Sequence, residues 1–211
     1  RSWDDFPGIA DMILEAHRRG KRTLVIVNTV RRALQVYQAL KRKKRKAAIV
    51  LVHSQFRPLD RQAALRRVLA EPGPEGTICV ATQVVEAGVD ISASTLVTDL
   101  APWPSLVQRF GRCNRYGTDQ EARIYWLSPP RDGAGRIKDK SVLPYAADDL
   151  ASAAEYLREL KNAAPSRLAS LPLKAPYSHV IRSRDIIDLF DTTPDLAGMD
   201  IDISRFIREA D

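Results

Sequence analysis

Three arginines recur at a spacing of three in the segment QRFGRCNRYG, residues 108–117. On a helix that turns by about 100° per residue, Gln108, Arg112 and Arg115 share one narrow stripe, whereas Arg109 lies about 100° away. Two permanently charged guanidinium groups beside an amide are suited to binding phosphate and to stabilising the charge that develops during phosphoryl transfer. The alternative interpretation is a solvated arginine face on an ordinary helix.

Apolar and amphipathic segments alternate through residue 128 and would position this stripe. The predicted strands are 22–28, 47–53, 77–82, 94–100 and 122–128, and the predicted helices are 6–20, 29–40, 58–70 and 104–115. Such alternation predicts an α/β fold in which a parallel sheet carries helices on both faces. Thr29 can cap the second helix. Ligand sites in such sheets lie beyond the carboxyl ends of the strands, where several of the chain's polar side chains fall.

The composition is that of a globular protein with a basic surface. Of the 211 residues 45% are hydrophobic, and the formal net charge is +7. An excess of positive charge favours a polyanionic partner. The block KRKKRK, residues 41–46, is either the solvated end of a helix or a contact to a phosphate backbone.

The chain shows no apolar run of membrane-spanning length and no leader after Arg1, so we expect an excised piece of a longer, cytoplasmic protein without a membrane partner. Cys79 and Cys113 are expected to be reduced thiols in apolar surroundings. Beyond residue 128 the sequence changes to a polar loop, a helix over 145–161 and a separate tail. We therefore divide the chain into a domain of residues 1–128 and a linker, helix and mostly helical accessory extension of residues 129–211.

Two motifs together resemble a known family. ATQVVEAGVDIS, residues 81–92, and the later QRFGRCNR resemble motifs V and VI of superfamily-two helicases, A-T-x-x-x-E-x-G-x-D-[IV] and Q-R-x-G-R-x-x-R. TLVIVNTV resembles motif IV, and HSQFRPLDR resembles the nucleic-acid-contacting segment that follows the next strand. The resemblance covers residues 21–128 and is strongest to the CRISPR-associated helicase–nucleases of type I systems.

The resemblance implies the second of two RecA-like domains, with ATP bound between this domain and a missing first one. Since no phosphate loop or D-E-x-H box is present, the first domain would hold the Mg²⁺. By the same resemblance, Arg112 and Arg115 are arginine fingers and Gln108 is a third group on the phosphate side. Asp90 would bind the ribose hydroxyls, although without the motif a cap or turn aspartate is the favoured interpretation. Gly88 would let the backbone approach the nucleotide.

The other side of the domain would face single-stranded DNA. Thr29, Ser54 and Thr82 are candidates for hydroxyl contacts to phosphate, which suit a motor that moves over any sequence. Each is about as readily explained as a turn or cap residue. Glu86 is predicted to hold the motif V segment by a salt bridge or a backbone hydrogen bond. No metal ligands are expected, so the family's nuclease activity would belong to another domain or chain.

Two functions remain open from the sequence. The first is the C-terminal motor half of an ATP-dependent DNA helicase or translocase in CRISPR interference, with the surveillance complex as a further partner and no activity in this chain alone. The second is a non-catalytic interaction module for nucleic acid or protein, with vestigial nucleotide motifs. The first hypothesis predicts that Arg112 and Arg115 are exposed and poorly paired here, because their partner domain is absent.

Overall fold

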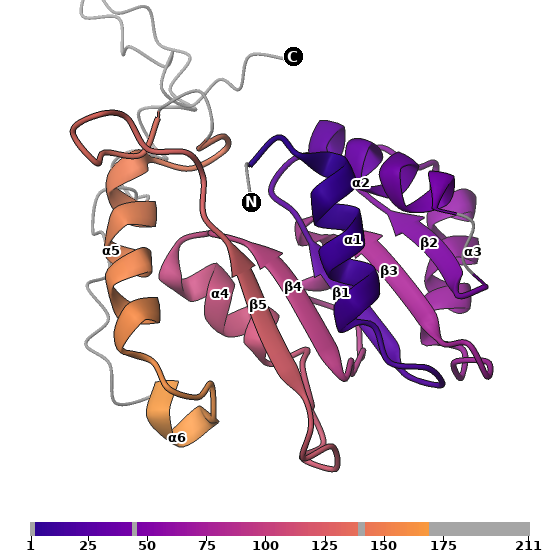
Figure 1. The fold of residues 1–211 in the computed structure, drawn as a ribbon. Coiled ribbons are helices and arrows are strands. Elements are labelled where there is room, and N and C mark those ends of the chain that lie inside the picture. Colours follow the sequence, from indigo (N-terminus) through magenta and orange to yellow (C-terminus); the bar gives the residue numbers. More distant parts are fainter. Residues whose placement is uncertain (1–2, 44–45, 139–141, 169–211) are drawn as a thin grey trace, which may run out of the picture. The chain divides into compact units, whose positions relative to one another are not determined.

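The structure, a computed structural model, describes residues 3–43, 46–138 and 142–168. Its centre is a sheet of five strands in the order β2-β3-β1-β4-β5, in which every pairing is parallel (Figure 1). The strands are β1 (Arg22–Ile26), β2 (Ala48–Val52), β3 (Thr77–Ala81), β4 (Thr95–Asp99) and β5 (Arg123–Leu127). Each lies within its predicted range, so the predicted parallel sheet is confirmed.

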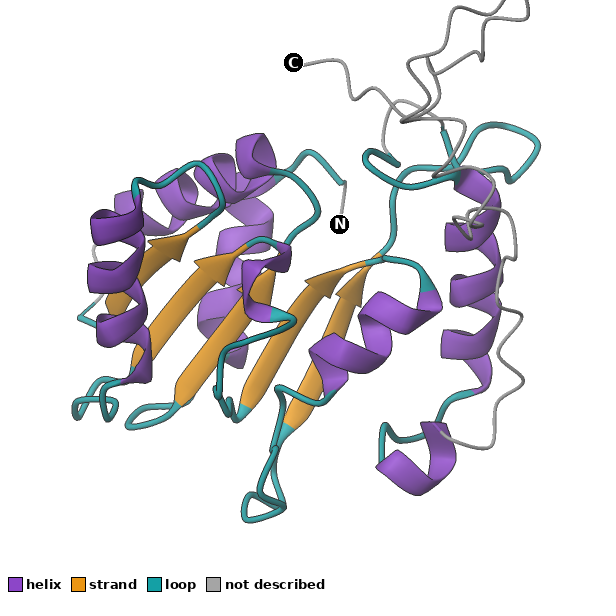
Figure 2. Ribbon diagram, turned by 180° about the vertical axis from the view of Figure 1, so that it is seen from behind, coloured by secondary structure: helices purple, strands orange, loops and turns teal. Residues whose placement is uncertain are grey.

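Helices cover both faces of the sheet, as predicted. The helices are α1 (Phe6–Ala16), α2 (Val30–Arg42), α3 (Pro58–Leu69), η1 (Gln83–Val85), α4 (Trp103–Phe110), α5 (Ala147–Glu159) and α6 (Pro165–Leu168). Helices α1 and α2 pack on one face, whereas α3 and α4 pack on the other (Figures 1 and 2).

Alternate residues of each central strand feed two separate cores. Leu24 and Ile26 of β1 belong to the core beneath α3 and α4, whereas Val25 belongs to the core beneath α1 and α2. The side chains of a strand point alternately to its two faces, so a strand buried on both faces must be apolar at nearly every position. All five residues of β3 and of β4 are accordingly buried.

Local signals set the starts of two helices. The Asp5 carboxylate accepts a hydrogen bond from the Gly8 backbone N–H at 3.0 Å and caps α1. The Thr29 hydroxyl accepts one from the Arg32 backbone N–H at 3.2 Å and caps α2, as predicted.

The end of α4 differs from the prediction. The helix was expected to continue to about residue 115, but it stops at Phe110 with Gly111 as its C-cap. The chain then turns, and Asn114 adopts a left-handed backbone conformation with φ of 47°. Arg112 and Arg115 therefore do not lie on the helix. The prediction that they share a helical stripe with Gln108 is wrong.

Helix α5 continues the same compact unit beyond β5. Its buried residues Leu150, Ala153, Ala154 and Leu157 recur at helical spacing and join the core beneath α4. The predicted helix over 145–161 is thus present. The rest of the predicted extension, residues 169–211, lies outside the described residues, and the domain boundary after residue 128 stays a prediction.

Candidate nucleotide-binding face

All three arginines at spacing three reach the same segment of chain, residues 82–92, here called the motif V loop. This loop follows β3, and the arginines follow or end α4. Backbone hydrogen bonds align the two segments, because the Ala93 N–H donates to the Arg112 carbonyl at 2.9 Å and the Asn114 N–H donates to the Ala93 carbonyl at 2.8 Å. Side chains near residue 112 are thereby placed opposite the end of the loop.

Arg109 is completely buried. Its Nε donates to the Glu86 carboxylate at 2.8 Å, which forms an ion pair with a side chain that is only 14% exposed. Its Nη1 donates to the Thr98 hydroxyl at 2.9 Å, and its Nη2 donates to the Asn28 side-chain oxygen at 3.1 Å. A buried guanidinium with this many partners fixes the elements around it.

Arg112 is also buried, with 8% of its surface exposed. Its Nη1 donates to the Val89 carbonyl at 2.8 Å and its Nη2 donates to the Glu86 carbonyl at 2.7 Å. Its Nε is buried without a hydrogen-bond partner in the described part of the chain. Arg112 therefore holds the backbone of the motif V loop in place.

Arg115 lies at the surface, and its side chain is 42% exposed. Its Nε forms an ion pair with the Asp90 carboxylate at 2.9 Å, and the Asp90 side chain is 69% exposed. The backbone N–H of Arg115 donates to the Ser92 hydroxyl at 3.1 Å. Exposed ion pairs of this kind contribute little stability, so an anion can compete for the arginine at small cost.

The expectation that both guanidinium groups are exposed and poorly paired is wrong for Arg112, and for Arg115 only the exposure is confirmed. Arg112 is buried and bonded to two carbonyls, and Arg115 is exposed but paired with Asp90. The cause is the early end of α4, which turns both side chains toward the motif V loop. The prediction for Glu86 is confirmed, because Glu86 holds this loop through its salt bridge to Arg109.

A buried polar network lies beside Arg109 at the carboxyl ends of β1 and β4. The completely buried Asp99 accepts hydrogen bonds from Arg32 Nε at 3.0 and 2.9 Å and from the Asn28 backbone N–H at 3.1 Å. Burial raises the pKa of the Asp99 carboxyl, and the charges of Arg32 and Arg109 oppose that rise. Asn28 follows β1 and Asp99 ends β4, at the edge where a ligand site was expected, but no motif predicted a role for either residue.

Gln108 and Gly88 lie where a ligand can reach them. Gln108 is exposed on the last turn of α4, and Gly88 is exposed in the motif V loop. The φ of Gly88 is +71°, which favours glycine, and a β-carbon added there would meet no atom within 4 Å. The loop therefore leaves open space beside its backbone at Gly88, two residues before Asp90.

The three candidate hydroxyls differ in exposure. Ser54 is exposed in the turn after β2, whereas Thr82 is only 2% exposed and offers little surface to DNA. Thr29 is half-buried, and its oxygen is occupied as the cap of α2. The cap interpretation of Thr29 is therefore confirmed, and the DNA contacts of all three residues stay predictions.

The two roles of Thr29 can be separated by substitution. We expect Thr29→Asn to leave the free energy of unfolding of this chain unchanged, and Thr29→Ala to lower it by about 1 kcal/mol, because asparagine caps helices and alanine does not. Urea unfolding of both variants measures this. If Thr29→Asn destabilises the chain as much as Thr29→Ala does, the hydroxyl does more than cap the helix.

Three other features were singled out in the sequence: the basic block, the two cysteines and the lack of a membrane-spanning apolar run. Lys41 and Arg42 occupy the last turn of α2, and Lys43 pairs with Asp11 at 2.7 Å. Cys79 and Cys113 are free thiols, and burial raises the pKa of Cys79 to about 12 and that of Cys113 to about 11. In the described segments, no helix is long and apolar enough to cross a bilayer.

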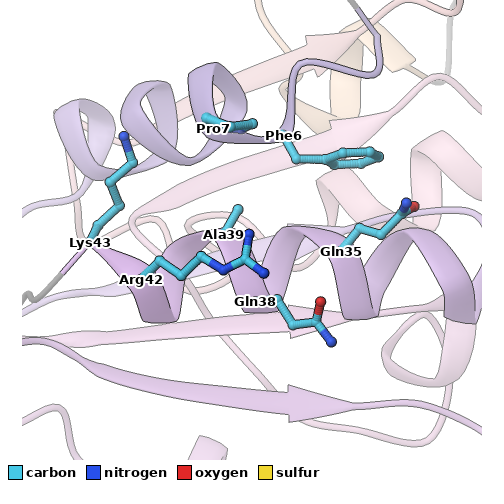
Figure 3. A pocket seen from close by; sticks show the side chains of 7 residues that line it. All are labelled: Phe6, Pro7, Gln35, Gln38, Ala39, Arg42 and Lys43. Atoms are coloured by element: carbon cyan, nitrogen blue, oxygen red, sulfur yellow. The ribbon is translucent and has the colours of Figure 1, made fainter.

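A groove of about 290 Å³ lies between α1 and α2, on the face of the sheet opposite α4. Phe6 and Ala39 contribute apolar surface, and Gln38, Arg42 and Lys43 add amide and positively charged groups (Figure 3). The groove shares no residue with the motif V loop or the arginines, so it is separate from the candidate site.

Residues 19–118, which contain both motifs, match the family described as "CRISPR-associated nuclease/helicase Cas3, C-terminal". This part of the chain is a Cas3-family helicase C-terminal domain. The CRISPR-associated helicase Cas3 of Thermoproteus tenax is 40% identical over 108 residues, 50% of this chain and 18% of that protein. A relative from Myxococcus xanthus is 36% identical over 153 residues, 71% of this chain and 19% of that protein.

A solved Cas3 structure shares the fold. The crystal structure of T. fusca Cas3-ADP superposes with a TM-score of 0.62 at 26% identity, covering 76% of this chain and 20% of that one. The predicted RecA-like fold of this Cas3-family domain is thus confirmed. The chain spans about a fifth or less of each of these three proteins.

Proposed function

We propose that this chain is the C-terminal motor half of an ATP-dependent DNA helicase or translocase that acts in CRISPR interference. The observation that carries the proposal is the contact of all three motif VI arginines with the motif V loop. Arg109 and Arg112 fix that loop from inside, while Arg115 remains at the surface, paired with Asp90 of the same loop. A partner domain placed against this surface would complete a phosphate site.

The residues present fit one side of an ATP site. Arg115 carries an exchangeable ion pair, Gly88 leaves open space, and Arg112 keeps one unpartnered Nε among the described residues. ATP, when bound, would supply the phosphoryl group whose hydrolysis drives movement. Arg115 would then exchange Asp90 for phosphate, which frees the Asp90 carboxylate to accept hydrogen bonds from the ribose hydroxyls.

Arg112 and Gln108 complete the proposed phosphate side. Gln108 is exposed and free to approach a nucleotide, whereas Arg112 must first release a carbonyl of the motif V loop. We propose that the Mg²⁺ is held by the missing first RecA-like domain. In the described residues, no cluster of His, Cys, Asp or Glu is arranged to hold a metal ion.

Partners of the full-length protein follow from the same proposal. Single-stranded DNA would pass the strand ends that carry Thr29, Ser54 and Thr82, and a nuclease domain of the same or another chain would cut it. A role beside a surveillance complex is supported by the similarity, at 25% identity and a TM-score of 0.53, to a chain of the solved pre-nicking CRISPR RNA-guided surveillance complex. The positive net charge of +7 favours the DNA contact.

The proposal predicts a division of activity between the full-length protein and this chain. We expect the full-length protein to hydrolyse ATP and to be stimulated by single-stranded DNA, because both halves of the site are present. This chain alone should show no turnover, since it lacks half of the phosphate cradle. Release of inorganic phosphate measures both. Clear turnover by this chain, or no DNA stimulation of the full-length protein, would contradict the proposal.

A further inference from the structure

Tyr145 contacts both motifs from outside the predicted domain. It lies in the turn before α5, where its backbone N–H donates to the Val142 carbonyl at 2.9 Å. Its hydroxyl oxygen is within 3.2 Å of Gln83 Nε2 and within 3.4 Å of Arg109 Nη2, and both nitrogens donate to it. One phenol oxygen thus joins the start of the motif V loop to the buried arginine of motif VI.

Both partners of the Tyr145 hydroxyl are central to the site. Gln83 begins η1 and also donates from Nε2 to the Asn28 backbone carbonyl at 2.9 Å. Arg109 holds the same Asn28 through its side-chain oxygen and holds Glu86 in the motif V loop. The hydroxyl therefore closes a ring of hydrogen bonds around the carboxyl end of β1.

The position of Tyr145 is set by α5 and not by the loop that it contacts. Helix α5 runs beside α4 (Figures 1 and 2), and Tyr156 packs against Trp103 with ring centroids 5.3 Å apart. Leu150 and Val142, which flank Tyr145 in the chain, are both buried in the core beneath α4. These anchors hold the phenol against the motifs, so a shift of α5 moves the hydroxyl.

We propose that Tyr145 is a positioning residue that couples DNA contact at the motif V loop to ATP turnover. The inference rests on the proposed function. Thr82, which is 2% exposed, lies at the start of the motif V loop and directly precedes Gln83, so a DNA strand that contacts this loop acts next to Gln83. Arg109 belongs to the segment that carries Arg112 and Arg115. A movement at Thr82 passes along the chain to Gln83 and then through the Tyr145 hydroxyl to Arg109, in addition to the direct ion pair of Arg109 with Glu86.

Loss of the hydroxyl should affect coupling more than folding. Without it, Gln83 keeps the Asn28 carbonyl, and Arg109 keeps Glu86, Thr98 and Asn28. A phenylalanine ring preserves the apolar contacts of the phenol. We therefore expect Tyr145→Phe to shift the melting temperature by at most about 3 °C while it weakens the link between Gln83 and Arg109.

The test uses full-length protein and measures ATP turnover with and without single-stranded DNA. We expect Tyr145→Phe to lower the ratio of stimulated to basal kcat about fivefold, with an unchanged KM for ATP. That is the typical effect of one full hydrogen bond, because the second of the two lost bonds, from Arg109, is long at 3.4 Å. Tyr37→Phe, in α2 on the other face of the sheet, is the matched control and should keep the wild-type ratio. A wild-type ratio in Tyr145→Phe, with wild type itself stimulated, overturns this inference alone. An unstimulated wild type overturns the proposed function as well.

A double-mutant cycle identifies the partner through which the hydroxyl acts. If the hydroxyl acts through Gln83, its removal should have no further effect once Gln83 is replaced. The double variant Tyr145→Phe/Gln83→Leu should then show the same ratio of stimulated to basal kcat as Gln83→Leu alone. Two fully additive losses would show that the hydroxyl and the amide act separately, which overturns the proposed route.

Discussion

Replacement of Arg115 by alanine in the full-length protein is expected to remove DNA-stimulated ATP hydrolysis, with a loss on the order of 10³-fold or more. The arginine lies at the exposed edge of the candidate site, and its ion-pair partner Asp90 is itself a proposed nucleotide contact. A guanidinium that stabilises the charge of a transferring phosphoryl group has a large effect on kcat. Folding should be intact, because the side chain is 42% exposed and its salt bridge contributes little.

A matched control separates this loss from a general effect of removing a surface arginine. Arg136 is 81% exposed and pairs with Asp132 at 3.1 Å, so Arg136→Ala removes the same kind of interaction at a residue outside both motifs. It should retain wild-type turnover. Turnover of Arg115→Ala within about tenfold of wild type would exclude Arg115 as an arginine finger. Arg112→Ala is a weaker test, since it also frees two carbonyls of the motif V loop.

Arg109→Ala is expected to be the most destabilising of these substitutions. Removal of the buried guanidinium leaves the Glu86 carboxylate, the Thr98 hydroxyl and the Asn28 side-chain oxygen without their donor. Loss of one partner of a buried ion pair costs about 3–5 kcal/mol, because the other charge remains desolvated. Urea unfolding of this chain should show that loss, and the melting temperature should fall by about 6 °C or more.

Two further variants test the origin of this effect. Arg109→Lys keeps the positive charge, but one ammonium group cannot reproduce the fork of a guanidinium, so it should restore less than half of the stability. Arg136→Ala should unfold like wild type, since its ion pair with Asp132 lies at the surface. If Arg109→Ala loses under about 1 kcal/mol, the buried network does not stabilise the fold as described.

The sheet was predictable from the sequence because burial on both faces requires uninterrupted apolar runs. β3 follows this rule at every position except Thr77, whereas β4 is buried throughout although Thr95, Thr98 and Asp99 are polar. The cap at Thr29 and the salt bridge of Glu86 were predictable for a similar reason: each depends on a short motif whose geometry repeats between proteins. The family motifs identified two segments that lie together in the structure.

The orientation of the arginines was not predictable in the same way. A helical wheel assumes that the helix persists, but α4 ends at Gly111, and the chain pairs with Ala93 instead. The wheel set Arg109 aside, although it is the most deeply buried of the three. The contacts of Tyr145 with Gln83 and of Arg109 with Asn28 join residues 62 and 81 positions apart, where no periodic pattern exists to reveal them.

The order of the strands gives these contacts a mechanical meaning. Strand β1 lies between β3 and β4, so the arginines that join the motif V loop to α4 bridge over its end, where Asn28 contacts both sides. In the proposed motor, tension from a DNA strand at that loop would pass through guanidinium groups into α4 and would not peel β3 from the sheet. The domain would move as a rigid body, and the first interaction to break under that tension would be the exposed ion pair of Arg115 and Asp90.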